Sequence, residues 1–109
     1  MTEVIITTGF RRAAKPLLKK YVSLRIELLN LTESLETTPI QGEPLGQDCY
    51  KLRLAIASKG QGKRGGARVV TCVKVVAETV YVLTIFDKSE RENLAPGELD
   101  ALLIAAGLG

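Results

Sequence analysis

Seven positively charged side chains and no acidic ones lie between Cys49 and Ala77, the stretch of this sequence best suited to chemistry on an anion. The seven are Lys51, Arg53, Lys59, Lys63, Arg64, Arg68 and Lys74. The whole chain has 15 basic and 12 acidic residues, so the rest of it has 8 basic against 12 acidic residues and a net charge of −4. A concentrated basic surface on an otherwise acidic domain is typical of proteins that bind phosphate, most often in nucleic acid. A charged, solvated face without a ligand is the alternative.

A glycine-rich segment, Ser58–Gly66, lies within this basic stretch and has the sequence SKGQGKRGG. Three of its glycines have the spacing of the dinucleotide fingerprint G-x-G-x-x-G, namely Gly60, Gly62 and Gly65. That fingerprint needs a helix after the glycines, whereas a strand is predicted here, and a chain of 109 residues without HRD or DFG motifs is not a kinase. The third interpretation is a flexible loop whose basic side chains are free to contact phosphates. Those side chains are Lys59, Lys63 and Arg64.

Arg68 opens a predicted strand, which would fix the direction of its side chain. A rigid guanidinium fork binds phosphate in bidentate fashion better than a loop lysine does. The alternative is an ion pair across the sheet with an acid such as Asp87 or Glu78. Tyr81 and Phe86 also allow two interpretations, because an aromatic residue in a strand usually packs in the sheet but can stack on an unpaired base beside basic side chains.

The composition argues against several other kinds of site. Two cysteines, Cys49 and Cys72, are too few for a disulfide framework, so we expect both thiols to be reduced. They lack the spacing of metal ligands, and the chain has no histidine, so we expect neither a zinc site nor any other cofactor. Cys72 lies in an apolar run and is expected in the core. The N-terminus lacks the pattern of a signal peptide, and no apolar run reaches the roughly 20 residues that cross a bilayer. We therefore expect one cytoplasmic domain over residues 1–109 with no membrane association.

The first part of the chain predicts a short strand and a pair of helices. Val4–Thr7 is apolar and β-branched, which favours a strand. Apolar residues then recur at helical spacing, at Phe10, Ala14, Leu17, Leu18 and Tyr21. Pro16 lies within this pattern and predicts a kink or a late helix start. A second helix should follow the N-cap Ser23, end near Pro39 and form a hairpin with the first. Its buried row is expected to be Leu24, Leu28, Leu31 and Leu35.

The second part predicts three strands and a final helix. Pro39–Gly46 is rich in turn-forming residues and is expected to be a loop. Lys51–Ile56 alternates apolar with mainly basic residues, as in a half-buried strand. Ala67–Val76 and Thr79–Phe86 are β-branched runs with a tight connection, as in a hairpin. A helix should begin near Pro96. The order β-α-α-β-β-β-α indicates an α+β fold.

Three segments resemble the RelE/HigB-like toxins of bacterial type II toxin–antitoxin modules, a group within the RelE/ParE superfamily. They are KLRLA at 51–55, KGQGKRGGARVV at 59–70 and VYVLTIFDKSERENLAPGEL at 80–99. A glycine-rich basic loop followed by Ala-Arg-Val, then an apolar strand ending in aromatic-x-Lys-Ser-Glu, is similar to that family's pattern. The resemblance implies a small, mostly antiparallel sheet with the helical hairpin on one face and a short C-terminal helix.

The resemblance also implies a ribosome-dependent mRNA endonuclease (an mRNA interferase) that blocks translation and needs no metal, since the 2′-hydroxyl of the RNA attacks the adjacent phosphate. Arg68 would then stabilise charge on the scissile phosphate. Lys63 would be the candidate base and Lys88 would complete the catalytic cluster. Contacts to the flanking RNA would come from Arg53, Lys59, Arg64 and Phe86.

Many members of the family that this chain resembles have tyrosines where it has Thr71-Cys72 and Phe86, so a hydroxyl that could donate a proton is missing here. Restoring it with Phe86→Tyr is then expected to raise cleavage. Two alternatives remain open: a ParE-like toxin that binds DNA gyrase without cutting nucleic acid, and a plain nucleic-acid-binding module. The implied partners are a cognate antitoxin that covers the cationic site, the ribosome and mRNA, in a toxin–antitoxin hetero-oligomer or a homodimer.

Overall fold

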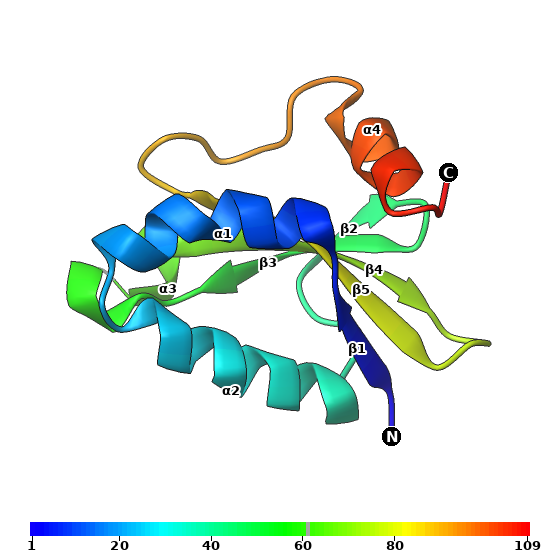
Figure 1. Cartoon of the computed structure of the whole chain (residues 1–109), viewed down its shortest axis with the longest axis horizontal. Helices are drawn as coiled ribbons and strands as arrows, with labels where there is room; N and C mark the ends of the chain where they lie inside the picture. Colours follow the sequence, from blue (N-terminus) through cyan, green and yellow to red (C-terminus); the bar gives the residue numbers. More distant parts are fainter. Residues whose placement is uncertain (61) are drawn as a thin grey trace.

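A five-stranded mixed sheet forms the centre of the molecule (Figure 1). The structure is a computed structural model, which describes residues 1–60 and 62–109 but not the side chain of Lys63. The strands are β1 (Glu3–Ile6), β2 (Glu43–Gly46), β3 (Cys49–Leu54), β4 (Ala67–Lys74) and β5 (Thr79–Asp87). Their order across the sheet is β1-β5-β4-β3-β2, in which β1 runs parallel to β5 and the other neighbours are antiparallel. The helices are α1 (Thr8–Lys20), α2 (Leu24–Thr37), α3 (Gly62–Gly65) and α4 (Glu98–Ala105), with a 3₁₀ turn at Ala57–Lys59.

Helices α1 and α2 cover one face of the sheet, because each presents an apolar stripe to the strands. The buried members of these stripes are Phe10, Ala14 and Leu17 in α1 and Leu24, Leu31 and Leu35 in α2. Thr7 caps α1 by accepting a hydrogen bond from the Phe10 amide at 3.2 Å, so the helix begins at Thr8 and continues through Pro16 instead of starting late. This helical face supplies the larger part of the core.

The opposite face of the sheet packs against α4 and carries a second, smaller apolar cluster. Its buried members are Cys49, Val70, Cys72, Leu83, Phe86 and Leu103. A bulge at Leu83 lies between the pairs Val70–Thr84 and Thr71–Val82, so Leu83 and Phe86 both point to this face. In Figure 1, α4 lies beside β2, and the 88–97 segment runs from the end of β5 to α4 across the remaining part of the face.

The two cysteines are neighbours across β3 and β4 in this smaller cluster, and both are free thiols, as expected. Burial and the adjacent Cys72 raise the pKa of the Cys49 thiol to about 12. The Cys49 thiol is therefore not a reactive group at neutral pH.

The α+β fold predicted from the sequence, with its helical hairpin on one face, is confirmed, but the order of elements contains one strand more than expected. Residues 39–46 include β2 and are not only a loop. Pro44 is tolerated because β2 is an edge strand, and Gly42 adopts a φ of +91° beside Lys51, where an added Cβ would lie 2.3 Å from the Lys51 carbonyl oxygen. The turn-forming residues thus serve an edge strand that pairs with β3.

The glycine-rich segment is also more structured than the predicted flexible loop. Its described residues form the 3₁₀ turn and the one-turn helix α3 before β4 begins at Ala67. Among the described helices, none has the length and apolar content needed to cross a membrane.

Candidate nucleic-acid interface

The pairing of β3 with β4 brings three cations to the face of the sheet that α1 and α2 leave uncovered. Lys51 and Arg53 alternate with Leu52 along β3, so both point to the same face as Cys49 of the smaller cluster. Arg53 lies directly opposite Arg68 on β4. The alternation read from the sequence therefore places these cations on one surface.

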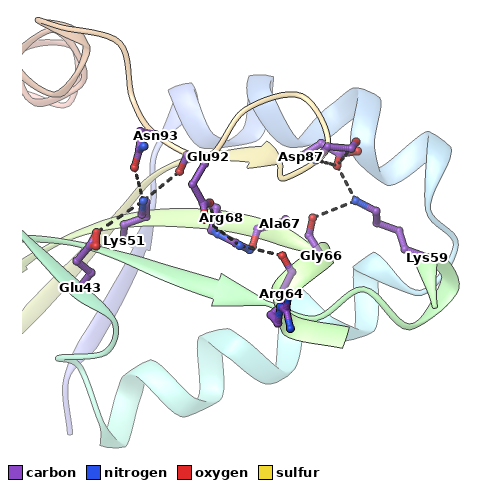
Figure 2. A network of polar contacts seen from close by, with 11 residues as sticks. Glu43, Lys51, Lys59, Arg64, Gly66, Ala67, Arg68, Asp87, Glu92 and Asn93 are labelled. Atoms are coloured by element: carbon purple, nitrogen blue, oxygen red, sulfur yellow. Dashed lines mark hydrogen bonds and ion pairs between the residues drawn. The ribbon is translucent and has the colours of Figure 1, made fainter. Parts of the chain in front are cut away.

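Arg68 is 1% exposed, and its guanidinium donates to a carboxylate and to backbone carbonyls (Figure 2). Its Nε donates to Glu92 Oε2 at 2.6 Å and its Nη2 to Glu92 Oε1 at 3.2 Å. Further bonds run from Nη2 to the Arg64 carbonyl at 2.9 Å and from Nη1 to the Ala67 carbonyl at 3.1 Å. A buried guanidinium needs such acceptors to offset its desolvation. The acid that pairs with Arg68 is Glu92, and not Asp87 or Glu78 as the sequence alternative proposed.

Two neighbouring cavities open around this pair. The first, of about 520 Å³, is lined by Lys51, Arg53, Arg68, Glu43, Glu92 and Asn93, among others. The second, of about 590 Å³, is lined by Arg53, Arg64, Gly65, Arg68, Lys88 and Glu92. Four cations against one carboxylate make the second cavity a strongly positive site of the kind that attracts phosphate.

Lys51 fixes the segment that carries Glu92. Its Nζ donates to the Glu92 carbonyl at 3.0 Å and to the Asn93 side chain, and it lies 3.6 Å from a Glu43 carboxylate oxygen (Figure 2). Together with Arg68, Lys51 therefore holds the 88–97 segment against the sheet. The sequence prediction of site residues omitted both Lys51 and Glu92. The period-two spacing of Lys51 and Arg53 could have indicated the first, but no sequence pattern indicated the second.

Lys59 was predicted to contact RNA from a mobile loop, but its side chain is only 7% exposed and is committed elsewhere. Its Nζ lies 2.6 Å from Asp87 Oδ1 and donates to the Gly66 carbonyl at 3.1 Å. Asp87 also accepts hydrogen bonds from Tyr21 and Ser89. Burial alone would raise the pKa of Asp87, but the hydrogen bonds from Lys59, Tyr21 and Ser89 outweigh it and hold that pKa well below its usual range. Lys59 is thus part of a buried ion pair and lines neither cationic cavity.

Phe86 was predicted as a stacking platform, but it is 6% exposed and belongs to the apolar cluster beneath α4. The Arg91 guanidinium lies 4.4 Å from the centre of its ring, and Phe86 lines neither cationic cavity. The ring is therefore buried, with the Arg91 guanidinium over it, and offers little free surface for a base.

Of the other predicted residues, Arg53, Arg64 and Lys88 meet Arg68 at the second cavity. Within the described part of the chain, no hydrogen bond or ion pair engages the side chains of these three residues, so all three can reach an anion. The predicted base, Lys63, has a side chain outside the described residues.

Gly66 joins the basic segment to β4 and lies close to β3. A Cβ at this position would be 2.0 Å from the Leu54 carbonyl oxygen, so only glycine fits without a backbone shift. The Gly66 carbonyl accepts hydrogen bonds from Lys59 Nζ and from the Lys88 amide at 3.1 Å each. This glycine thereby ties the basic segment to the end of β5, where Lys88 begins the 88–97 segment.

The protein is a small α+β domain with a pair of helices on one face of the sheet and a cationic site on the other. The chain belongs to the RelE family, because the family model described as "RelE toxin of RelE / RelB toxin-antitoxin system" matches residues 4–108. The resemblance seen in the sequence is confirmed by this match.

Solved structures agree on the fold. The chain is similar to a double-arginine mutant of the Escherichia coli toxin RelE in the free state, with 20% identity, a TM-score of 0.55 and coverage of 97% of this chain and 94% of that one. It is also similar to a metal-bound toxin from Helicobacter pylori, with 19% identity, a TM-score of 0.52 and coverage of 83% and 98%. The isolated E. coli RelE toxin matches with 20% identity, a TM-score of 0.51 and coverage of 95% and 99%.

Proposed function

We propose that this RelE-family toxin is an endoribonuclease that cuts mRNA on the ribosome. The observation that supports the proposal is the second cavity, where Arg53, Arg64, Arg68 and Lys88 surround a space large enough for a phosphate and its flanking nucleotides. Such preorganised cations stabilise the extra negative charge of a pentacoordinate phosphate more than the charge of the ground state.

The four cations of the second cavity have two roles, which depend on how exposed their side chains are. Arg53, Arg64 and Lys88 bind the phosphates of the RNA backbone directly, because their side chains reach the second cavity. Arg68 contributes a fixed positive charge beneath the scissile phosphate, since its position on β4 and its buried hydrogen bonds prevent it from turning away. In this reaction the 2′-oxygen of the RNA attacks the neighbouring phosphorus, and the products are a 2′,3′-cyclic phosphate and a free 5′-hydroxyl.

The test is cleavage of a defined mRNA by the purified protein with and without ribosomes, followed by mapping of the ends. We expect cuts only with ribosomes, and a fall of about 100-fold or more for Arg68→Ala, the scale for loss of one charge-stabilising donor. Because Arg68 is buried, Lys88→Ala provides a second variant at a more accessible position. Lys74→Ala is the matched control, since Lys74 pairs with Asp48 away from both cavities.

Intact mRNA from a correctly folded wild-type protein would contradict the proposal. Inhibition of DNA supercoiling by gyrase under the same conditions would then support the gyrase-binding alternative, which the shared fold does not distinguish. RNA binding that weakens steeply with salt, without cleavage or gyrase inhibition, would indicate a simple nucleic-acid-binding relative.

The family description pairs RelE with a RelB antitoxin, and we propose that the cognate antitoxin of this chain covers the cationic cavities. A segment with acidic side chains would be attracted to the surface that contains Arg53, Arg64 and Lys88. RNA should then bind more weakly to the toxin–antitoxin complex than to the free toxin. Equal RNA affinity of the two forms would contradict direct masking.

A further inference from the structure

We propose that Glu92 is the general base that removes the proton from the attacking 2′-hydroxyl, with Arg68 holding its carboxylate in place. The inference rests on the proposed nuclease function and replaces Lys63, the base expected from the sequence, with a carboxylate. It assigns a catalytic role to a residue of the 88–97 segment that no sequence pattern marks.

Glu92 lies where a bound RNA would meet it. Glu92 lines both cationic cavities, and its side chain is 39% exposed although the Arg68 side chain beneath it is only 2% exposed. Two fixed groups hold it there: Arg68 donates to both carboxylate oxygens, and Lys51 donates to its backbone carbonyl (Figure 2). A carboxylate held by an arginine yet open to the cavity is placed to accept a proton from a bound hydroxyl.

The two other described acids near this site, Asp87 and Glu43, are engaged elsewhere. The chain has no histidine. The side chain of Asp87 is 0% exposed and already accepts from Lys59, Tyr21 and Ser89. Glu43 lies at the first cavity only, with its side chain 62% exposed. Within the described residues, Glu92 is the one acid that lines the second cavity.

The chemistry balances without a further co-reactant. The 2′-hydroxyl proton passes to the Glu92 carboxylate, and the electron pair of the 2′-oxygen forms the new bond to phosphorus. The bond from phosphorus to the 5′-oxygen breaks, and this oxygen takes a proton from water. The hydroxide that remains takes the proton from Glu92 and restores the carboxylate.

The pairing with Arg68 gives the base a useful electrostatic property. Hydrogen bonding from Arg68, with the charges of Arg68, Lys51 and Lys88, holds the pKa of Glu92 below its usual range, so the group is ionised before RNA binds. A phosphodiester that binds in the second cavity competes for the same guanidinium charge. The proton affinity of the carboxylate therefore rises when substrate is present, which favours proton transfer at that moment.

The test compares Glu92→Gln with the matched control Glu90→Gln, whose exposed side chain on the same segment lines neither cationic cavity. Single-turnover cleavage of ribosome-bound mRNA and binding of the toxin to the same ribosomes are measured separately. Glutamine keeps an oxygen for the Arg68 hydrogen bond but does not accept the proton. We expect the cleavage rate of Glu92→Gln to fall about 100-fold with binding unchanged or tighter, and Glu90→Gln to cleave like the wild type.

Chemical rescue distinguishes a Glu92 that acts as a base from a Glu92 that only positions Arg68. The cavity left by Glu92→Ala lies beside the Arg68 fork, so added formate or acetate can occupy the place of the lost carboxylate. As a base, acetate should restore more cleavage than formate at equal occupancy, because acetate is the more basic. A group that only positions Arg68 would be replaced equally well by either anion.

If the wild type and Glu92→Gln cleave at the same rate, the assignment of Glu92 as the base is overturned, but the nuclease proposal is not. Faster cleavage by Glu92→Gln would show that Glu92 competes with the substrate for Arg68, and would also overturn it. Wild-type protein that leaves ribosome-bound mRNA intact would overturn the nuclease function and the base assignment together.

Discussion

Arg68 is a buried residue with a structural role and, in the proposed nuclease, a catalytic one. Its guanidinium is kept below the surface by the Glu92 carboxylate and by backbone carbonyls of Arg64 and Ala67. Removing it would leave the Glu92 carboxylate without its strongest partner, so a loss of stability accompanies any loss of cleavage. For this reason the half-buried neighbour Lys88, whose side chain lines the second cavity, is the cleaner probe of phosphate binding.

Phe86→Tyr is the residue-scale prediction on which the sequence and the structure differ. The family resemblance predicted that the added hydroxyl would raise cleavage. Phe86 is 6% exposed beneath the Arg91 guanidinium and lines neither cationic cavity, so we expect no increase in the single-turnover rate. The buried hydroxyl should instead lower the free energy of unfolding by about 1 kcal/mol, measurable by urea denaturation. A severalfold faster cleavage would show that the ring reaches the RNA.

At the scale of elements, the connection from β3 to β4 is fixed at several points. The 3₁₀ turn places Lys59 against Asp87 at the end of β5, and Gly66 brings the start of β4 close to Leu54. The Ala57 and Ser58 amides also donate to side chains at the start of α2, Glu27 and Ser23. Arg64 is thereby presented to the second cavity from a held segment, which would reduce the entropy lost in binding the RNA of the proposed reaction.

The element-scale prediction concerns the buried pair that closes this connection. Asp87→Asn should lower the free energy of unfolding by about 3 kcal/mol, because it leaves the Lys59 ammonium buried without its counter-charge. Lys59→Met should also destabilise the protein, and the two changes together should cost clearly less than their sum. Urea denaturation of the two single variants and the double variant measures this coupling.

The same variants separate a structural Lys59 from the RNA-binding Lys59 expected from the sequence. If Lys59 contacted RNA, Lys59→Met would weaken ribosome-dependent cleavage with little change in stability. Additive stability effects in the double variant, combined with such a loss of cleavage, would contradict the buried-pair interpretation.

At the scale of the whole molecule, the two faces of the sheet differ in what they carry. The face under α1 and α2 supplies most of the apolar core, and the other face divides between the α4 cluster and the cationic site. Three acids have pKa values below their usual range: Asp87, which bonds to Tyr21 at the end of α1, and Glu92 and Glu98 on the other side of the sheet. The folded state therefore binds fewer protons than the unfolded state in mildly acidic solution.

This linkage predicts how stability depends on pH. A carboxyl whose folded pKa is depressed contributes its full stabilisation above its unfolded pKa of about 4, and loses it as the pH falls toward the folded value. The urea midpoint should thus be nearly constant from about pH 6 to 8 and fall below about pH 4.5. Asp87→Asn should show a shallower fall, because Asp87 is the most strongly shifted of the three groups. Parallel curves for the wild type and this variant would exclude Asp87 as a main source of the acid sensitivity.

The sequence by itself determined most of the helices and strands and the positive charge of the candidate site. Helical spacing predicted α1 and α2, β-branched runs predicted the β4–β5 hairpin, and period-two alternation placed Arg53 among basic residues on one side of β3. These features depend on neighbours within a few residues, so a linear pattern records them. The edge strand β2 was missed because its proline and glycine have turn propensity, and only pairing with β3 makes the segment a strand.

Only the tertiary structure decided how the charged residues are used. Arg68 pairs with Glu92, 24 positions away, and Lys59 pairs with Asp87, 28 positions away, and neither distance has a period that a sequence pattern would reveal. The bulge at Leu83 turns Phe86 toward the α4 cluster, and Lys51 fixes the segment that carries Glu92. A basic stretch predicts an anion site, but burial and long-range packing determine which of its cations face the anion and which carry structural ion pairs.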